Sequence, residues 1–570
     1  MGYELMKYWP GFLLLLAGWL QPTHHLPWMS WHSEVLAFAA LAWLVLASLW
    51  KMKRAGQVQL AVPRIVVLPI ALGLYALIQL GLGQIQYFGD ALVVALYMAA
   101  CAMALTVGYQ QGLKSGGAPQ EAGLEAWLEQ LAATVVVGAC VSTAIMLVQA
   151  FQLLGTTDGI FQLQTYRRPG GNIGQTNHMA TLLLIGMASL AYLFERRRFG
   201  SLVAGMIQLV LMLGLAVTES RTGLLGAAML TAWLLVRRGL FPRMNPAYVM
   251  AAIWAHLLLL VWVWPFLITA IHHEHTGAGT RVGEGVGLRG VVGQQLLDAA
   301  LQRPLMGWGL REISQAYNAV LHRYPEGAPF SYAHNILLDL AVGIGLPLTL
   351  VLVVVCVRWF WRRARSAHTL NSWYCMALAI PLGTHSMLEY PHAYAYFLIP
   401  VLVAIGALEA GFVPRAALKI RTGYAGLLAL LVFLCLTWSA VEYVAIEEDF
   451  RVARFEALRI GQTSPAYKAP EVMLLTQLDA MLKASRITPG SEMSPDDIEL
   501  LRQAANRFPW TAIQNRYALS LALNGNPEEA MRQMQVMRAM HGEKHYEGIK
   551  ASWASQGEER YPQLKKLKLP

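Results

Sequence analysis

Long uninterrupted apolar stretches recur along this sequence, and they limit its possible folds more than any other feature. A helix that crosses the core of a bilayer needs about 20 apolar residues. About thirteen runs approach that length, near residues 9–20, 34–50, 64–82, 89–108, 127–153, 178–194, 201–217, 222–236, 247–271, 334–357, 371–388, 393–411 and 424–445. Backbone groups in lipid must form their hydrogen bonds within the segment, so such runs fold as helices. The sequence predicts an all-α polytopic membrane protein.

The composition agrees, because 56% of the 570 residues are hydrophobic and only 14% are charged, which excludes an ordinary soluble domain. A net charge of +10 would suit a nucleic-acid binder, but the basic residues gather in alternate gaps between the runs. They are Lys51, Lys53, Arg54, Arg196, Arg197, Arg198, Arg237, Arg238, Arg243, Arg358, Arg362, Arg363, Arg365, Arg415, Lys419 and Arg421. Loops rich in Lys and Arg remain in the cytoplasm. We therefore expect a lipid bilayer and no nucleic acid as partner.

This pattern also predicts the topology and the domains. The N-terminus is expected in the cytoplasm, as a retained first helix, and a large loop at about 272–333 on the outer side. Residues 1–446 form the predicted transmembrane domain, and residues 447–570 a small α-helical outer domain. In "NGNPEEA", Asn526 is a predicted N-cap and Pro527 the first helical residue, as in half of a tetratricopeptide repeat. This domain is interpreted either as a plain helical unit or as a docking surface for a protein.

Polar residues with catalytic potential lie in the predicted outer loops. His334 and Asn335 precede an apolar run, and with Ser331 as N-cap they would form its first helical turn. A neutral histidine there can act as a general base. The alternative is an interfacial histidine that bonds to its helix end.

Arginines and amides lie in other outer segments. Arg221, Arg281 and Arg289 would suit a pyrophosphate, because guanidinium groups bind phosphates with two hydrogen bonds. An ion pair of Arg221 with Glu219, or plain surface charge, is the alternative. The segment "RRPGGNIGQTNH" adds polar side chains that suit sugar hydroxyls or only satisfy their own loop: Asn172, Gln175, Asn177 and His178.

In "HSMLEYPHAYAY", His385 and Glu389 are four residues apart on one helix face, and Tyr390 follows. Tyr394 and Tyr396 suit an aromatic belt at the membrane surface. The sequence has no phosphate-binding loop, no nucleophile elbow and no zinc-type histidine pair. We therefore expect no metal and no cofactor. Because an outer active site also lacks ATP, a transfer reaction there needs a donor that is already activated, such as a lipid-linked pyrophosphate.

Five segments, in this order, resemble the bacterial O-linked oligosaccharyltransferases of the PglL, or pilin glycosylation, type: "RPGGNIGQTNHMATLL", "SRTG", "PLMGWGLREI", "HNILLDLAVGIGL" and "HSMLEYPHAYAYFLIP". That family belongs to the superfamily of O-antigen ligases and Wzy polymerases. The resemblance covers essentially the whole chain. Its "GGNIGQTNH" and "HSMLEYP" segments favour the protein-glycosylating branch.

The resemblance implies an enzyme of the inner membrane. It would transfer a glycan from undecaprenyl pyrophosphate to a serine or threonine hydroxyl of a periplasmic or pilin protein. His334, Gln175 and Tyr390 match the family's functional histidine, glutamine and tyrosine, and Arg221 and Arg289 match arginines that contact the donor. An O-antigen ligase or a Wzy polymerase is the alternative. A lipid-oligosaccharide transporter would instead require buried charge in a span, for which Asp339 is the main candidate.

Overall fold

The computed structural model describes residues 6–113, 121–153, 159–161, 168–272, 288–412 and 418–570. The chain divides into two compact units, each assembled from segments that are far apart in the sequence. The first unit comprises residues 1–71, 97–284 and 357–434, and the second comprises residues 72–96, 285–356 and 435–570. Four helices contain a boundary between the units: α4 (Val67–Gly81), α5 (Phe88–Gln111), α15 (Leu346–Ser366) and α18 (Thr422–Leu458).

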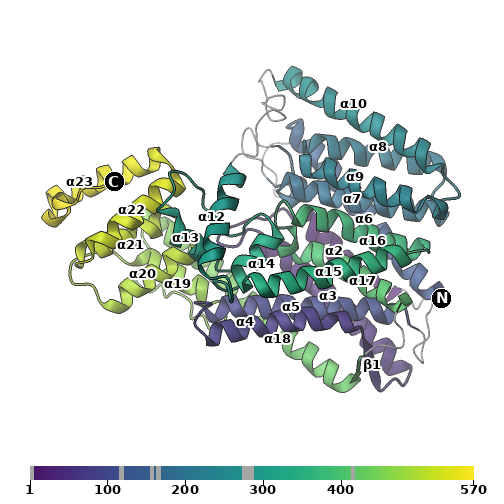
Figure 1. Ribbon diagram of the computed structural model, residues 1–570, viewed down its shortest axis with the longest axis horizontal. Coiled ribbons are helices and arrows are strands. Elements are labelled where there is room, and N and C mark those ends of the chain that lie inside the picture. Colours follow the sequence, from purple (N-terminus) through teal and green to yellow (C-terminus); the bar gives the residue numbers. More distant parts are fainter. Residues whose placement is uncertain (1–5, 114–120, 154–158, 162–167, 273–287, 413–417) are drawn as a thin grey trace. The chain divides into compact units, whose positions relative to one another are not determined.

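The first unit is a bundle of apolar helices (Figure 1). It contains α2 (Trp9–Leu20), α3 (Trp31–Arg54), α6 (Glu121–Ala150), α7 (Thr176–Glu195), α8 (Ser201–Val217), α9 (Arg221–Val236), α10 (Pro246–His272), α16 (Leu370–Ser386) and α17 (Ala395–Phe412). Its short 3₁₀ helices are η1 (Arg64–Val66), η2 (Gly171–Ile173), η3 (Arg238–Leu240) and η4 (Pro391–Ala393). Strands β1 (Gln59–Val62) and β2 (Leu418–Arg421) pair antiparallel.

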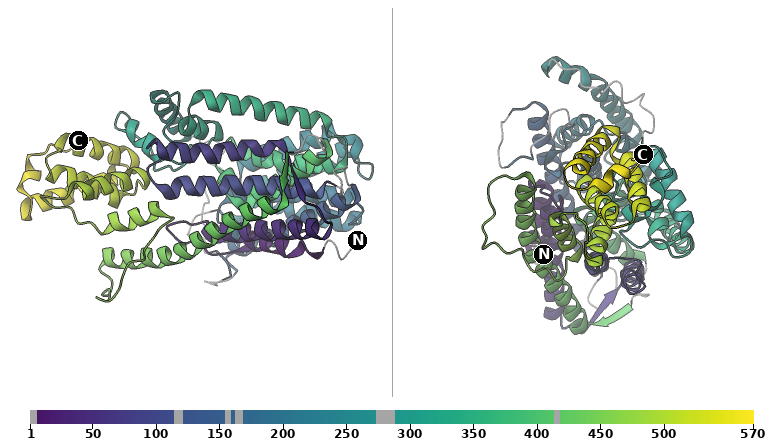
Figure 2. Two further views of the ribbon diagram at one scale, coloured as in Figure 1. Left: turned by 90° about the horizontal axis from the view of Figure 1, so that it is seen from below. Right: turned by 90° about the vertical axis from the view of Figure 1, so that its left-hand side faces the viewer.

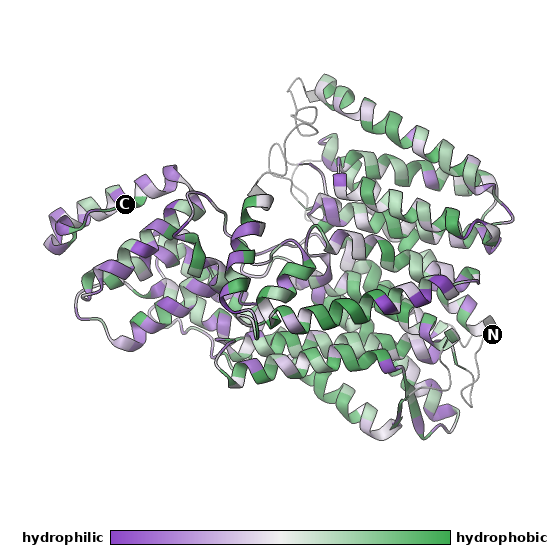
Figure 3. Ribbon diagram, viewed as in Figure 1, coloured by the Kyte–Doolittle hydropathy of each residue, from purple (hydrophilic) through white to green (hydrophobic). Residues whose placement is uncertain are grey.

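Helix α7 lies at the centre of this bundle, where it packs against α6, α8, α9 and α16. Of its most apolar 18-residue window, 78% is buried inside the protein, more than in any other long apolar helix of the described residues. The neighbouring helices are apolar along their length (Figure 3). A helix that is enclosed in this way can carry polar groups at its end without facing lipid. The N-terminus of α7 is therefore a place where a polar site can form.

Eight helices among the described residues are long and apolar enough to cross a membrane, and α2, α8 and α9 are shorter apolar helices. The eight lie at Trp31–Arg54, Arg64–Gly81, Phe88–Gln111, Gly123–Ala150, Thr176–Glu195, Pro246–Ile271, Ala395–Phe412 and Thr422–Leu458. The chain is accordingly a multi-pass membrane protein with a helical fold. The count of thirteen spans stays a prediction.

The predicted span at 334–357 is wrong as a single helix. Helix α14 (Ile336–Ile344) ends at Gly345, and α15 begins at Leu346. Gly345 has φ +83°, and a Cβ atom there would lie 2.4 Å from the carbonyl oxygen of Leu305. The backbone N–H of Leu346 donates to Pro304 over 2.7 Å. A loop from a distant part of the sequence therefore breaks the apolar run, and hydropathy alone contains no signal of that contact.

The second unit combines the large loop with the C-terminal tail, whose helices form a bundle (Figure 2). Its complete helices are α12 (Leu288–Gln302), α13 (Ile313–Leu321), α14, α19 (Thr476–Arg486), α20 (Pro495–Arg507), α21 (Thr511–Leu523), α22 (Pro527–His541), α23 (Glu543–Glu559) and η5 (Pro562–Lys566). One buried core joins Leu296 of α12, Tyr317 of α13 and Val536 of α22. The predicted N-cap and first helical residue are confirmed, because the Asn526 side chain accepts from the N–H of Glu529 and Pro527 is the first residue of α22.

A buried ion cluster lies in this second unit. Asp90 is fully buried and accepts from Arg507 Nε over 2.6 Å and from Arg311 Nε over 2.9 Å. Glu312 is equally buried and accepts from the N–H of Gln86 over 3.1 Å. Burial, together with the charge of Asp90, raises the pKa of Glu312 to about 7. The cluster links the start of α5 to the loop before α13 and to the end of α20.

Two close contacts fix α17 within the first unit. A Cβ atom at Gly406 would lie 2.0 Å from the carbonyl oxygen of Leu105, and one at Gly108 would lie 1.8 Å from that of Val403, so α5 and α17 cross with their backbones in contact. At its start, the N–H of Ala395 donates to the carboxylate of Glu34 over 2.7 Å. Helix α17 is thus held by residues about 300 or more positions earlier in the chain.

Candidate active site

Glu389 is the centre of a buried polar network in the first unit. Its carboxylate accepts from Asn177 Nδ2 over 2.6 Å, from Gln175 Nε2 over 3.1 Å and from His385 Nε2 over 3.0 Å. Only 1% of Glu389 is exposed. A buried carboxylate is stable only when donors satisfy it, and hydrogen bonds to a charged group are the strong kind. Gln175, Asn177 and His385, which the sequence singles out in two separate segments, therefore meet at the carboxylate of Glu389.

The local backbone explains why these side chains converge. Gly174 adopts φ +76° at the end of η2, and this turn places Gln175 at the N-cap of α7. Asn177, in the first turn of α7, accepts at Oδ1 from the hydroxyl of Ser220 over 2.7 Å. Ser220 in turn caps α9 by accepting from the N–H of Gly223 over 2.9 Å. One chain of hydrogen bonds therefore connects the end of α16 with the first turns of α7 and α9.

His178 lies beside this network in an aromatic cage. Its ring centroid is 5.4 Å from that of His385, 4.6 Å from that of Tyr394 and 6.3 Å from that of Tyr390. Tyr396 is also buried, with its hydroxyl 3.4 Å from His178 Nδ1. The prediction that Tyr396 belongs to an aromatic belt is therefore wrong, because its ring lies inside the protein. Tyr390 is only half-buried and stacks on Tyr394 with centroids 6.0 Å apart.

Three other polar residues of the first unit, Asn172, Arg221 and His392, lie within three positions of members of this network in the sequence. Asn172 donates to the carbonyls of Leu20 and Gly159 over 2.6 and 3.0 Å, so its amide holds backbone segments together. Arg221 is the first residue of α9 and is exposed. Burial and the nearby His385 lower the pKa of His392, in η4, to about 4. A neutral imidazole is therefore expected at His392 near pH 7.

His334 lies in the second unit, in a strained conformation directly before α14. It has φ +55°, a region that side-chain-bearing residues rarely adopt, and its ring packs on Phe330 with centroids 4.7 Å apart. Asn335 is the N-cap, because its Oδ1 accepts from the N–H of Leu337 and Leu338 over 3.0 and 3.1 Å. The predicted cap at Ser331 is wrong, since the left-handed turn at His334 starts the helix later.

Asp339 fixes the other side of this turn. Its Oδ1 accepts from the N–H of Ala333 over 2.7 Å. Asn335 and Asp339 thus hold the residues that flank His334. Strain of this kind persists only when surrounding contacts determine it, and it is frequent at functional sites.

Arg289 and Arg281 are the other two predicted donor-binding arginines. Arg289 lies in the first turn of α12, and its side chain is not described. Arg281 lies outside the described residues.

Glu34 is a polar residue of the first unit that sequence reasoning missed. It is buried, and besides the N–H of Ala395 it accepts from the hydroxyl of Tyr97 over 2.8 Å. Ala395 directly follows Tyr394 of the aromatic cage, so Glu34 helps to place that cage. A carboxylate inside an apolar run is the signal that could have found it.

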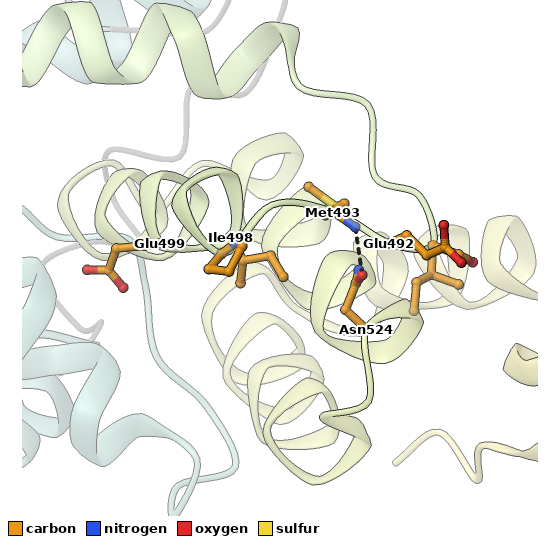
Figure 4. Close-up of a pocket in the computed structure, with 8 residues that line it drawn as sticks. Glu492, Met493, Ile498, Glu499 and Asn524 are labelled. Atoms are coloured by element: carbon orange, nitrogen blue, oxygen red, sulfur yellow. Dashed lines mark hydrogen bonds between the residues drawn. The ribbon is translucent and has the colours of Figure 1, made fainter.

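The C-terminal bundle has a pocket of about 590 Å³, lined by Ser491, Glu492, Met493, Pro495, Ile498, Glu499, Leu523 and Asn524 (Figure 4). Asn524 lies within it and accepts from the N–H of Met493 over 2.9 Å. Glu499 points away from Asn524 and is already paired with Arg502. The pocket contains none of the predicted site residues.

Three family models match consecutive parts of the chain. "Protein glycosylation ligase" matches residues 169–194, "O-Antigen ligase" matches 206–353, and "Virulence factor membrane-bound polymerase, C-terminal" matches 373–556. The first segment contains Gln175, Asn177 and His178. The second contains Arg221 and His334, and the third contains Glu389. All predicted site residues fall within these segments.

Two relatives from Acinetobacter baylyi (strain ATCC 33305 / BD413 / ADP1) are similar to this chain. A "General O-oligosaccharyltransferase" is 24% identical over 553 residues, which is 93% of this chain and 91% of that protein. A "ComP-specific O-oligosaccharyltransferase" is 24% identical over 328 residues, 57% of each. The chain therefore carries the O-antigen ligase and protein glycosylation ligase domains, and it is a glycosyltransferase of the O-linked oligosaccharyltransferase type.

Proposed function

We propose that this enzyme transfers a preassembled glycan en bloc from undecaprenyl pyrophosphate to serine or threonine hydroxyls of periplasmic or pilin proteins. The end-to-end similarity to a general O-oligosaccharyltransferase carries this proposal. The proposed location is the bacterial inner membrane, with the N-terminus in the cytoplasm and the C-terminal domain in the periplasm. The alternation of basic loops in the sequence supports that orientation.

Arg221 is proposed to bind the donor pyrophosphate, with Arg289 and Arg281 as further ligands. Arg221 is exposed at the N-terminus of the 16-residue helix α9, where backbone N–H groups and the helix dipole favour an anion. A guanidinium group at this position would stabilise the negative charge that develops on the leaving pyrophosphate.

His334 is proposed to deprotonate or orient the acceptor hydroxyl. Its strained backbone is held between Ala333, which Asp339 binds, and Asn335, which caps α14. A fixed imidazole can serve as a general base near neutral pH because its ordinary pKa is about 6.5. When the glycan bonds to the acceptor oxygen, the bond from the sugar to the pyrophosphate breaks and the hydroxyl proton passes to the base.

Gln175 and Tyr390 are proposed to orient the substrates, and Glu389 to hold Gln175 and Asn177 in place. The hydrogen bonds of 3.1 and 2.6 Å from these amides to the Glu389 carboxylate support a positioning role for Glu389. Such positioning matters, because a reacting group displaced by about 1 Å can lose about 100-fold in rate.

Transfer to a lipid-linked glycan acceptor is the second candidate. The matches to the O-antigen ligase and membrane-bound polymerase models favour it. An O-antigen ligase would use the lipid A core as acceptor, and a Wzy polymerase would use another glycan chain. These two reactions share the proposed donor, so only the acceptor distinguishes them.

The test is glycan transfer in a bacterial host that supplies an undecaprenyl-linked oligosaccharide and a candidate pilin. Mass spectrometry of the pilin and a blot of lipopolysaccharide are made from the same cells, for the wild type and for His334→Ala. Glycan on a pilin serine or threonine that the variant fails to add is the expected result. Glycan on the lipid A core, or in longer glycan chains, would overturn the proposal in favour of the second candidate.

A further inference from the structure

Three side chains of the first unit have a geometry that hydrogen bonding alone does not explain. His178, His385 and Glu389 each offer one ligand atom, and these atoms all lie within 4.8 Å of one another. Each residue is at most 2% exposed. His178 comes from α7, whereas His385 and Glu389 come from the end of α16 and the turn after it. The cluster therefore joins two packed helices.

The ion pair between His385 and Glu389 accounts for only part of this arrangement. His178 Nδ1 faces the Tyr396 hydroxyl, but His178 Nε2 is buried and has no hydrogen-bond partner among the described residues. A buried polar atom without a partner is energetically unfavourable. The rings of Tyr390, Tyr394 and Phe397 surround His178, and a bound ion would give this nitrogen the partner that it lacks.

The surroundings of the trio match the outer shell of a metal site. Ligating histidines usually bond through their second ring nitrogen to an oxygen atom, and ligating carboxylates are themselves hydrogen-bonded. His385 Nδ1 lies 2.7 Å from Thr181 Oγ1, and Glu389 accepts from the amides of Gln175 and Asn177. Each proposed ligand thus has a second partner that fixes its orientation.

From this we infer that His178, His385 and Glu389 form a buried binding site for a divalent transition-metal ion, with zinc as the first candidate. Two imidazoles and one carboxylate are a frequent zinc ligand set. Atoms that bind one zinc ion in tetrahedral geometry lie about 2.1 Å from it and hence about 3.4 Å apart. The ligand atoms of the trio lie within 4.8 Å of one another, so side-chain movements that total about 1.4 Å or less close the site.

This ion would hold the first turn of α7 against α16, and with it Gln175 and Asn177. The proposed ion contradicts the expectation from the sequence, which found no metal motif because His178 is about 200 residues from His385 and Glu389. The inference does not depend on the identity of the donor or the acceptor.

The test measures metal content of the full-length protein, purified with a tag that contains no histidine. Elemental analysis is expected to find about one zinc per chain in the wild type and little in His178→Gln. His392→Gln is the matched control, because His392 is a neighbouring half-buried histidine outside the trio, and it should retain the ion. A wild type without bound metal after growth with added zinc would overturn the inference, and so would equal zinc in wild type and His178→Gln.

A second measurement avoids the risk that the variant misfolds. The wild type is stripped with a chelator and titrated with Co²⁺, and four-coordinate nitrogen and oxygen ligation gives visible absorption bands. Thr181→Val removes the outer partner of His385 and leaves the three proposed ligands in place, and we expect it to weaken Co²⁺ binding by about 10–100-fold. Absence of the bands in the wild type, or unchanged affinity in Thr181→Val, would count against the site.

Discussion

Replacing Glu389 by glutamine removes a charge from the centre of the network while keeping the size of the side chain. Glu389 accepts at Oε1 from Asn177 and at Oε2 from Gln175 and His385. A glutamine must present an NH₂ group at one of these two positions, where it would face a donor. Hydrogen bonds to a charged group contribute about 1.5–3 kcal/mol, and we expect the first unit to lose about this much stability.

The structure also predicts a compensating change. In Glu389→Gln alone, Asn177 cannot simply rotate to accept from the introduced amide, because its Oδ1 already accepts from Ser220. When Asn177→Asp is combined with Glu389→Gln, one oxygen of the introduced carboxylate can accept from the introduced amide and the other from Ser220. Asn177→Asp alone would place two carboxylates in contact, which is unfavourable. The double variant should therefore be more stable than either single variant.

The assay is thermal unfolding of the purified proteins in detergent together with the rate of glycan transfer. We expect each single variant to unfold several degrees lower and to transfer glycan about tenfold more slowly or worse, and the double variant to recover most of both. Glu543→Gln is a control, because Glu543 is exposed in the C-terminal bundle and such surface pairs contribute at most about 1 kcal/mol. If the losses of the two single variants simply add in the double variant, the reasoning is refuted.

Three further predictions concern the second unit. Asp339→Ala removes the acceptor of the Ala333 N–H and should slow glycan transfer about tenfold, equivalent to about 1.4 kcal/mol. Asp339→Asn keeps an acceptor and should restore the rate, so equal rates in both variants would contradict this prediction. Arg507→Ala leaves the buried Asp90 with one arginine fewer and should destabilise the second unit by about 3–5 kcal/mol. Denaturant unfolding measures this loss, and a loss of stability below about 1 kcal/mol would contradict the prediction. Burial and His545 lower the pKa of His541 to about 4. The neutral imidazole therefore contributes stability that is present above about pH 6.5 and is lost as the pH falls toward 4. The thermal unfolding temperature should decline across this range, and His541→Gln should reduce the decline.

Hydropathy and charge made the helices predictable but not their interruptions. Every predicted apolar run overlaps helix in the structure, although the run at 334–357 is divided into two helices, because a long apolar run determines its own hydrogen bonding. The break at Gly345 depends on the loop at Pro304, about 40 residues earlier, and no local pattern encodes such a contact. The cap of α14 lies at Asn335 rather than Ser331 for a related reason, since the left-handed turn of His334 is set by tertiary contacts.

The candidate site was predictable as a list of residues but not as a network. The motifs named Gln175, Asn177, His385 and Glu389, yet only the packing of α7 against α16 shows that one carboxylate binds the other three. Glu34 and the cluster around Asp90 had no motif at all. Most of their partners are hundreds of residues away, so a single sequence gives no indication that the charges are paired.

The crossing of α5 and α17 has a consequence for how the chain is made. Gly406 can meet Leu105 only after the ribosome has synthesised some 300 further residues, and Glu34 finds the N–H of Ala395 at the same late stage. Until α17 is made, the Glu34 carboxylate lacks the Ala395 N–H as a donor, and a charged group within an apolar segment is energetically costly in lipid. Completion of the first unit is therefore a late event in biogenesis, and a chain truncated before α17 should be recognisable to membrane proteases as unfinished.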